Sequence, residues 1–510
     1  MKIIKYIFIG AAALMLSSCQ GDWLDTEPSS SISDKAVTAT TNNAKLGING
    51  LCKMMTRQYI GNGYNGEGGI KQFIGNYPGN NFVYPKGNYN NCINMNYIDS
   101  NTSTYCTYPW FYYYKLISNA NVIICNIDKA EGIESERQYI KAQALTFRAY
   151  SYTMLNQIYG NRWSDSDNGA TSSCVLRLDE SDGDIKTSTV GEVYGQIYND
   201  LDEAVKLFAE SGYKRPKDNN FLPDVNVAYA TYARAALNKQ DYTNASKYAA
   251  LARKNFPLMN VKDYMDGFSS PNSEWIWSSY GCLEETLYYH SFFANHAYNS
   301  NGSRVRNSPK CISKELYEKI PETDIRRDLF LDPMDDEYDT NYGMANKNSP
   351  LYKRAFASHP QLNSKSKIFA YMNWKFRALE LPGVGHLNHF RSSEMLLIEA
   401  ESAYFAGDED RTRNLMNELV RGSGRDPEYN CEKQGEALLA ELKTYRAIEL
   451  WGEGFDWFDM KRWNDPIIRK SFDDGGNFQD GVAVTIEPQD KNQWTWKIPR
   501  KEEDFNHGLK

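Results

Sequence analysis

The chain has 510 residues, and its 65 acidic residues outnumber its 57 lysines and arginines, which gives a formal net charge of −8. This balance excludes a nucleic-acid-binding protein built around a basic face. The length exceeds the roughly 250–300 residues at which a single core stops growing, so we expect one large composite body or two lobes in close contact. Aromatic residues make up 14% of the chain, and the mean hydropathy of −0.63 is too low for all of them to be buried.

The first residues predict an exported, lipid-anchored protein. Lys2 and Lys5 precede an apolar stretch over residues 7–16, which is about half of the roughly 20 residues that a membrane-spanning helix needs and is therefore typical of a signal peptide. The stretch ends in LSSC, the pattern of a lipoprotein cleavage site. We interpret residues 1–18 as the signal peptide and predict that Cys19 carries several acyl chains, which anchor a protein stably. An ordinary secretory signal followed by a chance cysteine is the alternative.

Residues 19–33 predict a tether, because they are too polar to bury and lack a helical repeat. Gln20, directly after the cysteine, gives no signal for retention in an inner membrane, and Asp22 and Asp25 favour export to the cell surface. No later stretch approaches transmembrane length, so we expect the rest of the chain to be soluble.

Apolar side chains recur at spacings of three and four residues in several segments, and this spacing predicts helices. The clearest segment is 135–159, in which Ile140, Ala144, Phe147 and Tyr150 would line one face. The expected helices cover residues 110–129, 135–159, 189–209, 224–238, 241–255, 392–406, 410–421 and 434–451.

Two helix pairs, 224–238 with 241–255 and 392–406 with 410–421, share a pattern. Small residues in the first helix allow a close crossing, and an aspartate before the second helix caps it. In the earlier pair Tyr242 is expected to pack back on the first helix. These pairs resemble degenerate tetratricopeptide units, although their spacing is too irregular for a regular solenoid. We predict a mainly α fold in which tetratricopeptide-like helical hairpins pack against an irregular, loop-rich subdomain.

Three long segments, 58–109, 257–308 and 332–373, lack a helical repeat. Loops of this length in a compact body usually have a function, and binding residues often lie on loops. Aromatic faces stack on the C–H groups of sugar rings, whose hydroxyls need polar partners such as asparagine. The candidate ligand-binding residues are Tyr77, Tyr84, Tyr89, Tyr97, Tyr288, Tyr289, Phe292 and Tyr298. For any single tyrosine, the alternative is that its ring packs between two helices. We assign Trp275 and Trp277 to a buried strand.

A segment near the C-terminus is rich in carboxylates and bases. Its acids are Glu449, Glu453, Asp456 and Asp459, and its bases are Arg446, Lys461 and Arg462. Because paired carboxylates can hydrolyse glycosidic bonds, a surface hydrolase using Glu449 and Glu453 is one hypothesis. Gly452 and Gly454 interrupt any helix there, and the bases can neutralise the acids. We therefore predict a salt-bridged corner and no enzymatic activity.

The sequence contains no motif of a catalytic metal site or of a zinc site. The nine cysteines are scattered, and no CxxC motif occurs. Cys92 and Cys106 are the closest pair for a disulfide, although several of the cysteines could equally well be buried free thiols. The acidic run over residues 332–339 could hold a structural calcium ion, but its spacing fits no EF-hand loop, so a solvated acidic loop is the preferred interpretation. We expect no cofactor and leave calcium open.

Five segments, in order, resemble the SusD/RagB family over nearly the whole mature chain. They are CQGDWLDTEP from Cys19, residues 141–160, residues 390–401, RAIELWGEGFDWFDMKRW over residues 446–463, and the terminal IPR with Glu502 and Asn506. Residues 446–463 form the most specific match. The resemblance divides the mature chain, after the tether, into an N-terminal SusD-like helical region over residues 34–255 and a loop-rich and C-terminal SusD/RagB region over residues 256–510.

The resemblance implies a lipoprotein anchored in the outer membrane and exposed at the cell surface. It implies that the protein binds an oligosaccharide or polysaccharide and delivers it to a SusC-like TonB-dependent transporter. It names no sugar, because the family varies its loops freely. The alternative from the helical hairpins is a protein-interaction scaffold that binds a peptide, or only the transporter, without affinity for glycans.

Overall fold

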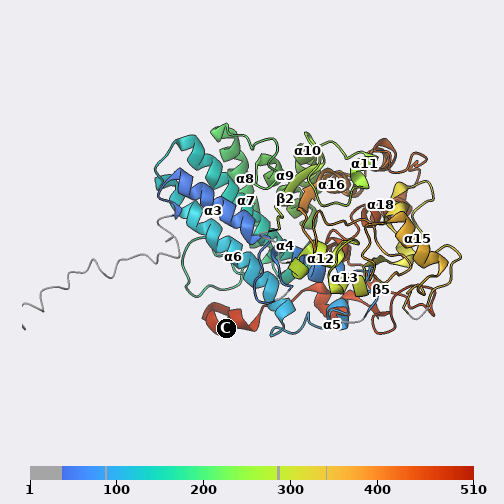
Figure 1. The fold of residues 1–510 in the computed structure, drawn as a ribbon. Coiled ribbons are helices and arrows are strands. Elements are labelled where there is room, and N and C mark those ends of the chain that lie inside the picture. Colours follow the sequence, from blue (N-terminus) through green and yellow to red (C-terminus); the bar gives the residue numbers. More distant parts are fainter. Residues whose placement is uncertain (1–36, 62, 87–88, 284–287, 340–341, 510) are drawn as a thin grey trace, which may run out of the picture.

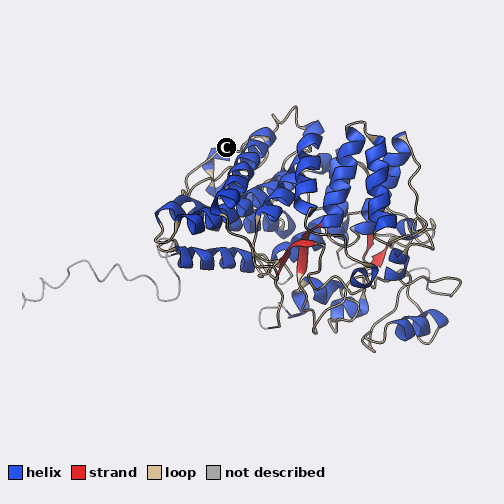
Figure 2. Cartoon of the chain, turned by 90° about the horizontal axis from the view of Figure 1, so that it is seen from above, coloured by secondary structure: helices blue, strands red, loops and turns tan. Residues whose placement is uncertain are grey.

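The computed structural model describes residues 37–61, 63–86, 89–283, 288–339 and 342–509. The predicted signal peptide, Cys19 and the tether lie outside the described residues. The described chain is mainly helical, as predicted, with short strands in its middle (Figures 1 and 2). None of its helices is both long enough and apolar enough to cross a membrane.

Long helices build the N-terminal half (Figure 1). They are α3 (Thr41–Met54), α6 (Thr104–Asn126), α7 (Glu134–Tyr159), α8 (Val190–Ser211), α9 (Val225–Asn238) and α10 (Tyr242–Arg253). Helix α7 lies among α3, α6, α8 and α9, and every one of its residues from 142 to 159 is buried. Its buried charge is compensated, because Nη2 of Arg148 lies 2.7 Å from Oδ1 of Asp200 on α8.

The predicted helix pairs are present, and they stack on one another. Helices α16 (Ser392–Phe405) and α17 (Glu409–Asn417) form the second pair, and α16 contacts α10 of the first. Asp241 and Asp408 cap α10 and α17 by accepting hydrogen bonds from the backbone N–H groups of the first helical turn, as predicted. The ring of Tyr242 stacks at 4.8 Å on Phe405 of α16, a contact with the second pair that the sequence did not predict.

Short elements build the rest of the body, which Figure 2 shows as loops and small helices beside the long-helix layer. The short helices are α4 (Gly66–Ile70), α5 (Asn90–Ile93), α11 (Val261–Tyr264), α12 (Phe292–His296), α13 (Ser303–Asn307), α14 (Lys314–Tyr317), α15 (Pro350–Ser358), α19 (Asp456–Trp463) and α20 (Arg500–Phe505), and the longer α18 (Gly435–Glu449) lies among them. Three antiparallel pairs join β1 (Phe82–Val83) to β3 (Cys311–Ile312), β2 (Trp275–Ser279) to β4 (Leu387–Arg391) and β5 (Ile467–Ile468) to β6 (Thr485–Ile486). Trp275 and Trp277 of β2 are fully buried, which confirms their assignment to a core strand.

The C-terminal segment folds back on the N-terminal half, beneath α6 in Figure 1. The backbone N–H of Trp496 donates to the carbonyl of Ile158 at the end of α7, and the N–H of Arg500 donates to the carbonyl of Asn101. The side chain of Asn506 accepts from the N–H of Ile185 at 2.9 Å. The last residues therefore fasten the two halves into one body.

The structure corrects one helix boundary and adds one helix. Helix α6 begins at Thr104, where the hydroxyl of Ser103 caps it, and Pro109 lies inside it. The predicted start at Trp110 was too late, because the prediction ended the preceding loop at Pro109, whereas the helix continues through this proline. Helix α3 was not predicted, although Ala44, Ile48 and Leu51 form its buried stripe.

The described cysteines and the acidic loop have internal partners. All eight described cysteines are free; the thiol of Cys92 donates to the carbonyl of Phe73 and that of Cys106 to the carbonyl of Lys497. In the acidic loop, Asp332 pairs with Arg327 and Asp336 with Arg354. Among the described residues, no group of three or more His, Cys, Asp and Glu side chains is arranged to hold a metal ion.

Candidate functional site

A buried aromatic base forms where the 58–109 segment folds against α6. The ring of Phe73, on the π-helical turn Lys71–Asn76, lies within 6 Å of the centroids of Tyr64, Tyr77, Tyr89 and Tyr105. Phe73 itself is 3% exposed. Rings that meet edge to face or at a tilt in this way are mutually favourable and leave little freedom of rotation.

Four half-buried tyrosines lie over this base, and we call them the tyrosine surface: Tyr64, Tyr89, Tyr97 and Tyr105. Tyr97 and Tyr105 stack with centroids 5.1 Å apart and planes at 15°, and Tyr105 meets Tyr64 at 5.8 Å. Burial raises the pKa of the Tyr89 hydroxyl, so this group stays protonated and can donate a hydrogen bond at neutral pH. The surface therefore offers apolar faces edged with neutral hydroxyls.

The second loop segment contributes an arginine beside these rings. A Cβ built on Gly63 would lie 3.6 Å from Nη1 of Arg304, so the guanidinium of this α13 residue lies against the glycine next to Tyr64. Burial raises the pKa of Tyr89, and the nearby charge of Arg304 opposes that rise. The amide of Asn65 donates to the carbonyl of His290 at 2.6 Å, which fastens the two segments together. The structure therefore brings the two loop segments together.

The predicted aromatic residues fall into three environments. Tyr89 and Tyr97 belong to the tyrosine surface, and Tyr289 is 51% exposed near Gly302 on the neighbouring segment. Tyr77 and Tyr84 are at most 5% exposed and support the ring of Tyr89 from beneath.

The remaining three predicted residues lie apart from the tyrosine surface or outside what can be placed. Phe292 is 5% exposed and stacks on His296 at 4.1 Å inside the body. Tyr298 packs in a separate group with Trp374 and His359. The side chain of Tyr288 lies outside the described part of the chain.

Tyr64 and Tyr105 were missed by the sequence analysis. Tyr105 precedes Tyr108 and Tyr112 at spacings of three and four, which is the signal of a helical face. The late start predicted for α6 hid this signal. Tyr64 follows a Gly-Asn-Gly turn and has no periodic signal of its own.

Three asparagines of the 58–109 segment have structural roles. Asn76 bonds the backbone of Gly452 and Gly454, and Asn81 donates to Asp456 from both its backbone and its side chain. Asn80 bonds the backbone around the start of β5. These side chains fix residues 446–463 against the 58–109 segment.

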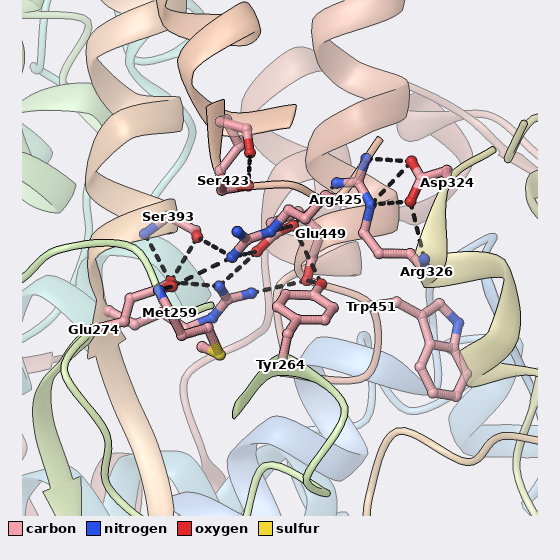
Figure 3. A network of polar contacts seen from close by, with 12 residues as sticks. Met259, Tyr264, Glu274, Asp324, Arg326, Ser393, Ser423, Arg425, Glu449 and Trp451 are labelled. Atoms are coloured by element: carbon pink, nitrogen blue, oxygen red, sulfur yellow. Dashed lines mark hydrogen bonds and ion pairs between the residues drawn. The ribbon is translucent and has the colours of Figure 1, made fainter. Parts of the chain in front are cut away.

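The carboxylates weighed as a hydrolase pair lie in a buried ion network, and Figure 3 shows the part of it around Glu449. Glu449 is fully buried and accepts from Arg326, Arg391 and Arg425 at 2.7–3.1 Å. Glu453 pairs with Arg391 and with Lys375. Neither carboxylate is open to a substrate.

The salt-bridged corner is confirmed, but most of its partners differ from those predicted. Of the four acids, Arg446 and Arg462 pair only with Asp459, and Arg462 also pairs with Glu401 on α16. Lys461 donates to the carbonyl of Gly160 instead of to an acid. The bases that neutralise Glu449 and Glu453 come from distant parts of the chain.

The fold is that of SusD-like proteins. It matches a SusD-like carbohydrate binding protein from Bacteroides vulgatus with a TM-score of 0.74 at 22% identity, covering 92% of this chain and 97% of that one. It also matches a SusD superfamily protein from Bacteroides thetaiotaomicron with a TM-score of 0.72 at 21% identity, covering 92% and 99%.

Comparison of the amino-acid sequence with known families agrees with this match of the fold. The family model described as starch-binding associating with outer membrane matches residues 22–237, and the model described as SusD family matches residues 260–509. The chain is 23% identical over 505 residues to SusD-like protein P38 of Formosa agariphila, covering 91% of this chain and 92% of that one. The chain belongs to the SusD family.

Proposed function

We propose that this protein captures a glycan at the cell surface and passes it to a SusC-like TonB-dependent transporter. The tyrosine surface carries the proposal. Its four rings are partly open to solvent. Tyr64, Tyr89 and Tyr105 pack on the buried ring of Phe73, and Tyr97 stacks on Tyr105. A sugar ring can stack on such a face while its hydroxyls bond the phenol groups and Arg304, and a preformed platform loses little entropy on binding.

Two further findings support binding without hydrolysis. The two carboxylates that could have acted on a glycosidic bond are enclosed in ion pairs, so the site has aromatic faces but no accessible catalytic pair there. The relative from Bacteroides vulgatus is described as carbohydrate binding, and family membership extends the same expectation to this chain.

The proposal places the protein on the outer membrane through lipid at Cys19. We expect Cys19→Ser to abolish incorporation of radiolabelled palmitate and to release the protein from the membrane fraction, because the acyl chains would be its attachment. Ser18→Ala, which keeps the cysteine, serves as the control and should remain membrane-bound. Full membrane retention of Cys19→Ser would exclude a lipid anchor at this residue.

The binding role is tested by removing rings from the tyrosine surface. The test uses a polysaccharide that retards the wild type in affinity gel electrophoresis. We expect Tyr89→Ala and Tyr97→Ala each to lower the affinity for this polysaccharide by about tenfold or more, which corresponds to about 1.4 kcal/mol. Tyr213→Ala is the matched control, since this ring is 40% exposed at the end of α8.

The outcomes separate the two candidate functions. Retardation that is unchanged in both ring variants would move the site elsewhere on the protein. If no polysaccharide of a broad panel retards the wild type while a barrel protein co-purifies with it, the chain is instead a scaffold for the transporter.

A further inference from the structure

Five basic side chains lie beside the tyrosine surface, and we call them the basic rim: Lys86, Arg304, Arg306, Lys310 and Lys367. Short contacts hold their segments together. The backbone N–H of Lys86 donates to the hydroxyl of Ser308 at 3.1 Å, and that of Lys367 donates to the carbonyl of Arg306 at 2.8 Å. The ammonium of Lys310 lies 4.1 Å from the ring centroid of Tyr84, which in turn meets Tyr89.

Within the described part of the chain, no carboxylate forms an ion pair with any of the five side chains of the basic rim. This is unexpected in a chain whose acidic residues outnumber its lysines and arginines. The buried arginines behave differently, since Arg326, Arg391 and Arg425 all pair with carboxylates. The rim is therefore a local positive region on an acidic protein.

Two of the lysines lie close enough to influence each other. The nearby ammonium of Lys367 lowers the pKa of Lys86. Two like charges at such a separation repel each other unless an anion lies near them. Lys310 is also held at a cost, because burial lowers its pKa to about 7 although its ammonium donates to the carbonyl of Ser308.

From this arrangement we infer that the ligand of the tyrosine surface is an anionic glycan, whose carboxylate or sulfate groups bind the basic rim while its sugar rings stack on the tyrosines. The inference rests on the proposed function and adds the class of substrate. A neutral sugar would use the rings but leave the half-buried cations Lys86, Arg304, Arg306 and Lys367 without an anionic partner, whereas Lys310 is buried beneath them. An anionic group accepts charge-assisted hydrogen bonds, which are roughly twice as strong as neutral ones, and arginine can bind it in bidentate fashion.

Uronic acids and sulfate esters share this chemistry, so the experiment needs an arm for each. We would measure affinity electrophoresis with polygalacturonate against galactan, and with sulfated carrageenan against its desulfated product. We expect at least one charged polymer to bind at least about tenfold more tightly than its neutral counterpart in 50 mM NaCl. The difference should shrink in 500 mM NaCl, because added salt screens charges at the surface.

Charge-removing variants locate the effect. Arg304→Gln, and separately the double variant Lys86→Gln/Lys367→Gln, should each weaken binding of the charged polymer about tenfold and flatten its dependence on salt. Lys206→Gln/Lys247→Gln is the charge-matched control, since both lysines are exposed on α8 and α10, away from the rim. Far-ultraviolet circular dichroism would verify that all variants fold.

Each outcome decides a different claim. If galactan binds as tightly as polygalacturonate and desulfated carrageenan binds as tightly as carrageenan, the inference fails and the proposed function stands. The inference also fails if a charged polymer binds but the rim variants bind it like the control. If none of the four polymers binds and a wider glycan panel is also silent, the proposed function fails together with the inference.

Discussion

Replacing Arg391 with methionine should lower the free energy of unfolding by about 3–5 kcal/mol, because it leaves buried carboxylates without their cation. Arg391 is 1% exposed at the end of β4. Its guanidinium donates to Glu274 and Glu449 at 2.7 Å and to Glu453 at 2.8 and 2.9 Å. Methionine keeps the volume of the stem but supplies none of these hydrogen bonds.

Urea denaturation followed by tryptophan fluorescence measures this loss. Arg411→Met is the matched control, because Arg411 pairs with Glu399 at 3.2 Å but is 47% exposed, and exposed ion pairs contribute at most about 1 kcal/mol. If Arg391→Met were no less stable than Arg411→Met, the attraction within the network would only balance the cost of burying its charges.

The decrease in unfolding free energy caused by Arg391→Met should depend on pH. Burial alone raises the pKa of Glu449, but Arg425, Arg391 and Arg326 outweigh burial and hold it well below its usual value. A folded-state pKa below that of the unfolded chain stabilises the protein above about pH 4.3, and this stabilisation disappears as the pH falls. The difference in unfolding free energy between the wild type and Arg391→Met should therefore narrow below that pH.

The long helices could be predicted from sequence because each carries its own signal. In α7 the spacing of Ile140, Ala144 and Phe147 alone indicates the helix, and the caps at Asp241 and Asp408 mark the starts of α10 and α17. The ion network has no such local signal. Glu274, Arg391 and Glu449 are separated by 58 residues or more, and only the tertiary fold brings them together.

The candidate site was predicted only in part, because local sequence does not distinguish an exposed ring from a buried one. Tyr77 and Tyr89 occur in similar Gly- and Asn-rich surroundings, yet Tyr77 is 1% exposed and Tyr89 is half-buried at the surface. The position of Arg304 against Gly63 also depends on the tertiary fold, because the two residues are far apart in the sequence. Asparagine is equally ambiguous, because its amide forms hydrogen bonds with a sugar hydroxyl as readily as with a backbone group.

Asn76 shows how strongly an asparagine of this loop can serve the fold. Its amide donates to the carbonyl of Gly452 at 2.8 Å, and its oxygen accepts from the N–H of Gly454 at 2.8 Å. The two backbones meet so closely that a Cβ on Gly75 would lie 2.1 Å from the carbonyl oxygen of Gly454. Asn76 is fully buried, so water cannot replace its hydrogen bonds.

We expect Asn76→Asp to reduce the free energy of unfolding at pH 7 by about 2–4 kcal/mol. Aspartate has almost the same shape, but it offers no donor to the carbonyl of Gly452 and places a charge in a buried position. Asn119→Asp is the matched control on the exposed face of α6, where the change should stay within about 0.5 kcal/mol. Urea denaturation of both variants gives the comparison. Equal stability of the two would mean that residues 446–463 are held by apolar packing alone, whereas the expected difference would assign Asn76 a central part in docking them.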